Sequence, residues 1–222
     1  MKRLAIFDLD GTLLNTIADL AQSTNHALKL LGLPTHEPEA YKLMVGGGIN
    51  KLFLRALPPE LKDEEHVARV RALFLPHYDE HNADLTRPYP GIVELLGDLQ
   101  RAGVQLAVAS NKYQSATEKL IRVYFGGIRF IAVLGQREGV NVKPDPVIVD
   151  DIMAKAVGIS RDETLYIGDS GVDMQTAANA GVEACAVTYG FRPRSELEPY
   201  RPSHIVDSPE AIRDFFPLHV DT

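Results

Sequence analysis

A series of short apolar runs that alternate with segments of helical periodicity is the strongest constraint on the fold. The runs are rich in Val, Ile, Leu and Ala with little polar alternation, which is typical of strands covered on both faces. Their alternation with helices indicates a parallel α/β sheet. The expected strands are Leu4–Asp8, Val104–Ser110, Ile128–Leu134, Thr164–Gly168 and Glu183–Thr188. The expected helices are Ile92–Ala102, Tyr113–Tyr124, Pro146–Val157 and Asp173–Ala180, with a short peripheral helix at Pro209–Phe216.

One long segment interrupts this alternation. After the first strand no strand pattern is found for about seventy residues, and apolar residues such as Ile17, Leu20 and Leu28 recur at helical spacing instead. The segment is too long for a connecting loop, and the Pro- and Gly-rich stretch 87–91 indicates a boundary where it ends. We therefore expect an α/β catalytic core formed by residues 1–14 and 87–222, and a helical cap domain formed by residues 15–86.

Composition excludes several classes of protein. The net charge of −7 provides no basic excess for a nucleic-acid or anionic-membrane surface, although a small phosphorylated ligand needs only a few positive groups. Cys185 is the single cysteine, which excludes an intrachain disulfide and a CxxC zinc site. No apolar run reaches the roughly 18 residues of a membrane span, and the start MKRLAIFDLD lacks the apolar region of a secretory signal. We expect a cytoplasmic protein without nucleic-acid or membrane partners; the sequence leaves its oligomeric state open.

Four polar motifs lie at the ends of expected strands or in the loops beside them. They are Asp8–Thr12, Ser110–Asn111, Lys143–Pro146 and Gly168–Asp173. In a doubly wound parallel sheet the carboxyl ends of the strands line one edge, where ligands bind. We therefore expect these four motifs to meet at that edge, although they are far apart in the chain.

The residue types at that edge indicate phosphoryl chemistry. Crowded carboxylates repel one another unless a cation lies among them, and oxygen ligands without His or Cys suit Mg²⁺. Lys143 and the Ser110 hydroxyl can hold anionic phosphate oxygens. A carboxylate such as Asp8 can attack phosphorus, and Asp10, two residues later, can protonate the leaving alcohol and then activate water.

DLDGTLLNT, SNK, KPDP and GDSGVDM, in this order and approximate spacing, resemble the four motifs of the haloacid dehalogenase-like family. The resemblance covers the expected core nearly end to end. It implies a doubly wound parallel sheet, a Rossmann-like core, with a small helical cap domain inserted after the first strand. It also implies that Mg²⁺ is the cofactor and that a phosphoaspartate intermediate forms.

The resemblance assigns roles to individual residues. It implies the nucleophile at Asp8, the general acid/base at Asp10, and phosphate-binding or charge-stabilising groups at Ser110, Asn111 and Lys143. It implies a metal site formed by Asp169, the Asp8 carboxylate and the Asp10 carbonyl, with Asp173 as a supporting carboxylate.

The helical insertion resembles the cap of the phosphoglycolate phosphatase-like branch. In that branch the segment equivalent to Val45–Ile49 faces the substrate, which implies that Gly47 and Gly48 bind it. The branch commonly carries an Asp where this chain has Asn15. We expect this change to affect helix capping or the start of the cap, and not the chemistry.

The function expected on these grounds is a Mg²⁺-dependent phosphatase, a phosphoric monoester hydrolase acting on a small phosphorylated metabolite, with phosphoglycolate first. Three alternatives stay open: a pyrophosphatase, a sugar-phosphate phosphatase or mutase, and a noncatalytic protein that binds a phosphometabolite. The mutase is disfavoured because the Thr and Arg spaced four apart in the cap hinge of sugar mutases are missing here.

Overall fold

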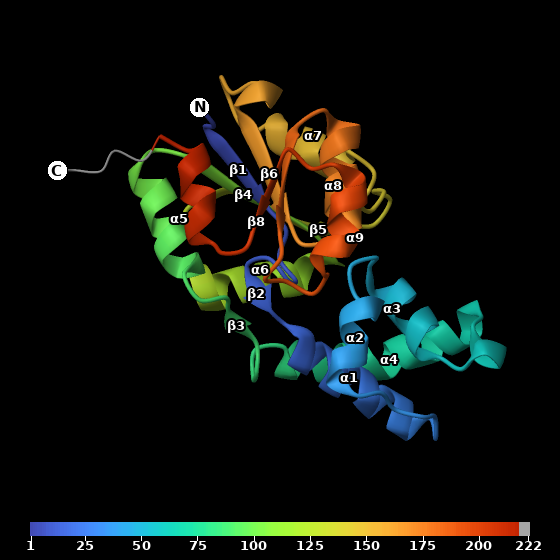
Figure 1. Cartoon of the computed structure of the whole chain (residues 1–222). Coiled ribbons are helices and arrows are strands. Elements are labelled where there is room, and N and C mark those ends of the chain that lie inside the picture. The colour runs from blue at the N-terminus through green and yellow to red at the C-terminus, as the bar shows by residue number, and fades with distance from the viewer. Residues whose placement is uncertain (218–222) are drawn as a thin grey trace.

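The computed structural model describes residues 1–217 and contains a six-stranded sheet in the order β5-β4-β1-β6-β7-β8 (Figure 1). Every neighbouring pair in this sheet is parallel. The strands are β1 Leu4–Phe7, β4 Gln105–Tyr113, β5 Phe130–Gln136, β6 Thr164–Gly168, β7 Glu183–Val187 and β8 His204–Val206. All six carboxyl ends therefore point to the same edge of the sheet.

Helices cover both faces of the sheet, because alternate strand residues are apolar on both sides. In β1, Ala5 and Phe7 belong to one buried cluster, whereas Leu4 and Ile6 belong to another. The first cluster is covered by α5 (Ile92–Arg101), α6 (Gln114–Phe125) and the 3₁₀ helix η4 (Glu210–Phe215). The second is covered by α7 (Val147–Met153), α8 (Gly171–Ala180) and α9 (Arg194–Leu197), and the short 3₁₀ helices η2 (Arg161–Glu163) and η3 (Glu198–Tyr200) complete the core.

A helical insertion falls between β1 and β4 in the sequence and packs at one end of the core in Figure 1. Its elements are α1 Ile17–Leu30, α2 Pro38–Met44, α3 Ile49–Ala56, η1 Pro59–Leu61 and α4 Glu64–His81. They bury a separate apolar cluster that includes Phe53, Phe74 and Tyr78. The predicted fold class, a doubly wound parallel sheet with a helical cap after the first strand, is confirmed.

The longest of these helices, α4, has 18 residues and carries charged side chains along its length. Among residues 1–217, none of the helices combines the length and the apolar character needed to cross a bilayer.

Several element boundaries differ from the expectation. β4 continues to Tyr113 instead of ending at Ser110, because Tyr113 still pairs with Gln136 of β5 after an irregularity in register. The strand β8 was not expected, since it is only three residues long. The expected helix Pro209–Phe216 is a 3₁₀ helix, and the expected helix Pro146–Val157 ends at Met153 and continues as turns.

Two short strands connect the insertion to the core. They are β2 (Leu14–Asn15) and β3 (Arg87–Pro88), which pair antiparallel. Beside them the Asp19 carboxylate is fully buried and accepts hydrogen bonds from the main-chain N–H groups of Leu85 and Thr86, at 3.0 and 2.8 Å, and from the Thr86 hydroxyl at 2.7 Å. Asp19 therefore ties the first turn of α1 to the chain that returns to the core.

We predict that Asp19→Ala lowers the free energy of unfolding by about 3 kcal/mol, because it leaves the buried N–H and hydroxyl donors of Thr86 without their acceptor. Denaturant unfolding measures this change. Asp63→Ala is the comparison, since the Asp63 side chain caps the exposed start of α4. It should cost clearly less, and equal losses for both variants would contradict the role given to Asp19.

Candidate active site

The predicted motifs converge at the carboxyl edge of the sheet. Asp8 directly follows β1, Ser110 lies within β4, and Asp169 directly follows β6. Lys143 comes from the segment between β5 and α7. Adjacent parallel strands bring these groups together, since β1 pairs with both β4 and β6.

Lys143 is the centre of the polar network. Its buried Nζ, with three N–H donors, has four acceptors within hydrogen-bond distance: Asp8 Oδ1 at 2.9 Å, Asp173 Oδ1 at 2.7 Å, the Ala109 carbonyl at 2.8 Å and the Tyr166 hydroxyl at 3.0 Å. Burial alone disfavours the ammonium form, but the carboxylates of Asp173 and Asp8 outweigh it and hold the pKa of Lys143 well above its ordinary value. A fixed positive charge therefore lies beside Asp8.

Three buried carboxylates face one another with a single lysine between them. Asp8, Asp169 and Asp173 each offer an oxygen atom within 4.8 Å of the others. Burial, and then the charge of Asp173, raises the pKa of Asp8 to about 7 although Lys143 opposes the shift. Burial and the charges of Asp173 and Asp8 likewise raise the pKa of Asp169 well above its usual range. The excess of negative charge and the all-oxygen donors fit a hard divalent cation.

The oxygens of Asp173 already have partners within the protein. Oδ1 contacts Lys143, while Oδ2 accepts from the Ser170 hydroxyl at 2.6 Å and from the Ser170 N–H at 3.1 Å, as a capping box at the start of α8. Asp169 accepts from the Phe191 N–H at 2.7 Å through Oδ2. Asp173 is thus positioned to orient Lys143.

A glycine allows the first motif to pack against Asp169. Gly11 has φ of 93°, and a Cβ at this position would lie 2.2 Å from Asp169 Oδ2. Gly190 approaches from the other side, where a Cβ would lie 2.4 Å from the Asp169 Cβ. The carboxylate is therefore enclosed by two backbone segments that leave no room for a side chain.

Asp10 lies in a different environment from Asp8. Its Oδ1 accepts from the Thr16 hydroxyl at 2.6 Å, and its Oδ2 is 3.2 Å from Lys112 Nζ. Lys112, two residues after Ser110 in β4, was not among the predicted site residues. Its Nζ donates to the Tyr78 hydroxyl of α4 at 2.8 Å and lies 4.7 Å from the centre of the Tyr78 ring. Lys112 is the third residue of the SNK motif, but the motif alone does not mark it as buried, because a lysine at a strand end is ordinarily solvated.

Asn111 bridges the core and the insertion. Its Nδ2 donates to the carbonyls of Gly46 and Lys143 at 3.0 and 3.1 Å, and its Oδ1 accepts from the Lys143 N–H at 2.8 Å. The side chain is therefore engaged with the backbone on both sides. The Ser110 Oγ accepts from the Lys112 N–H at 3.1 Å and keeps its own proton for another acceptor.

Arg192 makes a second connection between core and insertion. It lies in the loop after β7, and its guanidinium donates to the carbonyls of Lys42 and Val45 at the end of α2, the latter at 2.8 Å. No sequence motif marks this arginine, because its acceptors are backbone carbonyls nearly 150 residues earlier.

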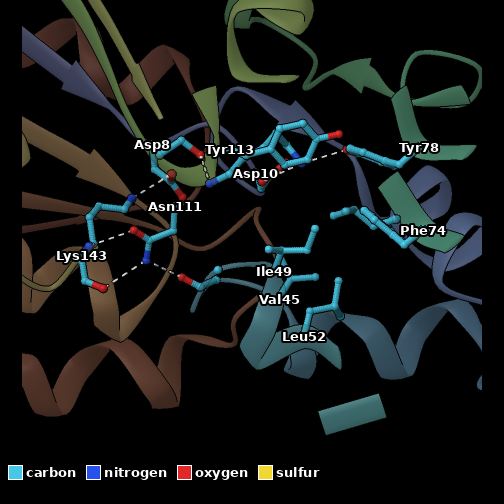
Figure 2. A pocket seen from close by; sticks show the side chains of 15 residues that line it. Asp8, Asp10, Val45, Ile49, Leu52, Phe74, Tyr78, Asn111, Tyr113 and Lys143 are labelled. Carbon is cyan, nitrogen blue, oxygen red and sulfur yellow. Dashed lines mark hydrogen bonds and ion pairs between the residues drawn. The ribbon is translucent and has the colours of Figure 1, made fainter. Parts of the chain in front are cut away.

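A cavity that is partly open to solvent lies between the core and the insertion. Its lining residues are Asp8, Asp10, Leu20, Val45, Gly46, Gly48, Ile49, Leu52, Phe74, Tyr78, Ser110, Asn111, Lys112, Tyr113 and Lys143. Figure 2 shows the polar groups of Asp8, Asn111 and Lys143 on one side and Val45, Ile49, Leu52 and Phe74 on the other.

Of the two glycines expected at the substrate, only Gly48 lines this cavity. Gly47 lies against its own helix instead, where a Cβ would be 2.6 Å from the Lys51 Cδ. The reason is the turn into α3, which begins at Ile49 and folds Lys51 back over Gly47.

Comparisons with known proteins agree with this arrangement. The family of haloacid dehalogenase-like hydrolases matches residues 5–187. A phosphoglycolate phosphatase of Mesorhizobium japonicum is 33% identical over 211 residues, which cover 94% of this chain and 92% of the relative. Phosphoglycolate phosphatase 1 of Pseudomonas aeruginosa is 33% identical over 98% of this chain and 79% of the relative.

Solved structures agree as well. The crystal structure of a proposed phosphoglycolate phosphatase from Lactobacillus delbrueckii subsp. bulgaricus superimposes with a TM-score of 0.90 at 34% identity, covering 98% of this chain and 100% of that one. The family match covers most of the chain, and the relatives and the solved structure match nearly all of it. The chain therefore belongs to the haloacid dehalogenase-like hydrolase family.

Proposed function

We propose that this protein is a Mg²⁺-dependent phosphatase that transfers the phosphoryl group of a small monoester to Asp8 and then to water. The observation that carries the proposal is the fixed Lys143 ammonium between Asp8 and Asp173, with Asp10 in the same cavity. This arrangement joins a nucleophile, a positive charge and a second carboxylate with different surroundings.

Each residue has a chemical part in the two steps. The Asp8 carboxylate forms a bond to phosphorus while the bond from phosphorus to the leaving oxygen breaks, and Asp10 gives its proton to that oxygen. Asp10 then takes a proton from water, which attacks phosphorus and frees Asp8. Lys143 and the Ser110 hydroxyl bind the phosphoryl oxygens throughout.

The metal would be held by the carboxylates of Asp8 and Asp169 and by the main-chain carbonyl of Asp10. When bound, Mg²⁺ neutralises charge on the phosphoryl oxygens and on the attacking carboxylate. Asp173 acts as the supporting carboxylate, because its oxygens hold Lys143 and Ser170. Asn111 acts by holding the backbone of Lys143 against the insertion.

A phosphoglycolate-like monoester is the substrate that we favour. The two curated relatives described above are named phosphoglycolate phosphatases. The apolar wall of Val45, Ile49, Leu52 and Phe74 offers no partners to the hydroxyl groups of a sugar. We assign this selection to a cap domain bounded at residues 15 and 86, in which Gly48 lets the backbone approach the substrate.

We predict that Asp8→Asn lowers hydrolysis of p-nitrophenyl phosphate in the presence of Mg²⁺ by at least about a thousandfold, because an amide cannot serve as the nucleophile. Release of p-nitrophenol measures the rate. Asp145→Asn is the matched control, since Asp145 lies in the Lys143 loop but binds only Asn141 and the Val147 N–H. Equal rates for wild type and Asp8→Asn would remove the covalent mechanism, and a wild type that hydrolyses no phosphate ester would favour a binding protein.

We predict a pH-dependent stability that Mg²⁺ suppresses. The folded pKa of Asp8, about 7, lies above its ordinary value of 3.8, so the folded state keeps a proton that the unfolded chain loses in this interval. Without metal, the melting temperature should therefore fall as pH rises from about 4 to about 7. Mg²⁺ favours the ionised carboxylates and should reduce the fall. Thermal melts in EDTA and in Mg²⁺ test this, and parallel curves would contradict cation binding at Asp8 and Asp169.

A further inference from the structure

Lys112 is a buried cation that the proposed reaction leaves without a role. It is 7% exposed, and its Nζ lies between Asp10 of the core and the Tyr78 hydroxyl of the insertion. An ammonium group is costly to bury, so its surroundings must supply negative charge or hydrogen bonds. Here one carboxylate and one hydroxyl supply them at 3.2 and 2.8 Å.

The two lysines that line the cavity have different carboxylate partners. Lys143 contacts Asp8, which attacks phosphorus in the proposed reaction, whereas Lys112 contacts Asp10, which protonates the leaving oxygen. A group that reaches the leaving oxygen must lie beside the leaving group. We therefore place Lys112 Nζ, at 3.2 Å from Asp10 Oδ2, on the leaving-group side of the proposed reaction.

The rest of the leaving-group side of the cavity offers little charge to a ligand. It is lined by apolar side chains of the insertion and by the rings of Tyr78 and Tyr113. Among the cavity-lining residues, all within the described part of the chain, Lys112 is the cation available to a leaving group. Tyr78 accepts from Lys112, so its own hydroxyl proton is free to donate to a second oxygen of the same ligand.

We infer that Lys112 determines specificity by binding a carboxylate on the leaving group, with the Tyr78 hydroxyl as the second donor. The substrates selected are phosphate monoesters of short hydroxy acids. This inference rests on the proposed function and adds a residue to it. Because Lys112 belongs to the core and Tyr78 to the insertion, such a carboxylate is held by both parts of the protein at once.

If Lys112 had a purely structural role, its loss would affect substrates differently. If the lysine only orients Asp10 and holds α4, its loss should impair every substrate by the same factor. If it binds a carboxylate, its loss should impair only substrates that carry one. The preference between two substrates, measured within one variant, separates these roles and does not depend on how much of that variant is folded.

The kinetic test compares phosphoglycolate with ethyl phosphate, which lacks the carboxylate. Wild type should prefer phosphoglycolate by about 10- to 100-fold in kcat/KM, the effect of a buried charged hydrogen bond. Lys112→Met should reduce the preference to below about threefold, mainly through KM for phosphoglycolate. Lys51→Met is the control, because it removes a lysine charge from the exposed side of α3, outside the cavity lining, and should keep the preference. A preference unchanged in Lys112→Met overturns the inference.

A binding test separates this inference from the proposed function. Phosphonopropionate, a non-hydrolysable analogue that carries the carboxylate, is compared with propylphosphonate by calorimetry in the presence of Mg²⁺. Tighter binding of phosphonopropionate by wild type, lost in Lys112→Met, supports the role of Lys112 even if turnover fails. Turnover of both esters with equal binding of both phosphonates overturns the role of Lys112 while the phosphatase stands.

Discussion

The ion pairs of Lys143 with Asp8 and Asp173 are the interaction on which the rest of the site depends. They join β1, the segment before α7 and the start of α8, three parts of the chain that the parallel sheet brings to one edge. One lysine cannot balance three buried carboxylates, so the protein alone leaves Asp8 and Asp169 with raised pKa values. The fold thus creates a local excess of negative charge that a divalent cation relieves, and the same cation is what phosphoryl chemistry requires.

The cavity divides its chemistry between two structural units. The core supplies every carboxylate and lysine of the lining, from the ends of β1 and β4 and from the segment before α7, and the insertion supplies the apolar wall and the Tyr78 hydroxyl. Rigid strands hold reacting groups to the accuracy that catalysis needs. The apolar wall makes no hydrogen bonds to those groups, so substitutions there are expected to change selectivity more than the chemistry.

Sequence patterns predicted the sheet, the insertion and the motifs that meet, because strand hydrophobicity and the residues after each strand are local features. The extension of β4 was missed, since Ser110, Asn111 and Lys112 are polar yet buried around the site. Lys112 and Arg192 were missed for a related reason: their partners, Tyr78 and the carbonyls at the end of α2, are distant in sequence and become neighbours only after folding. That Gly48 lines the cavity while Gly47 lies against Lys51 was not predictable, because three consecutive glycines do not reveal the turn into α3.

The loop after β7 contacts both the carboxylate cluster and the insertion. At Phe191 it donates to Asp169, and at the next residue, Arg192, it holds the end of α2. The residue that contacts Asp169, a proposed cation ligand, is therefore directly bonded to the residue that contacts the insertion. The position of the insertion and the position of the Asp169 carboxylate are therefore set by two neighbouring residues of one loop. A substitution that displaces this loop should disturb both at once.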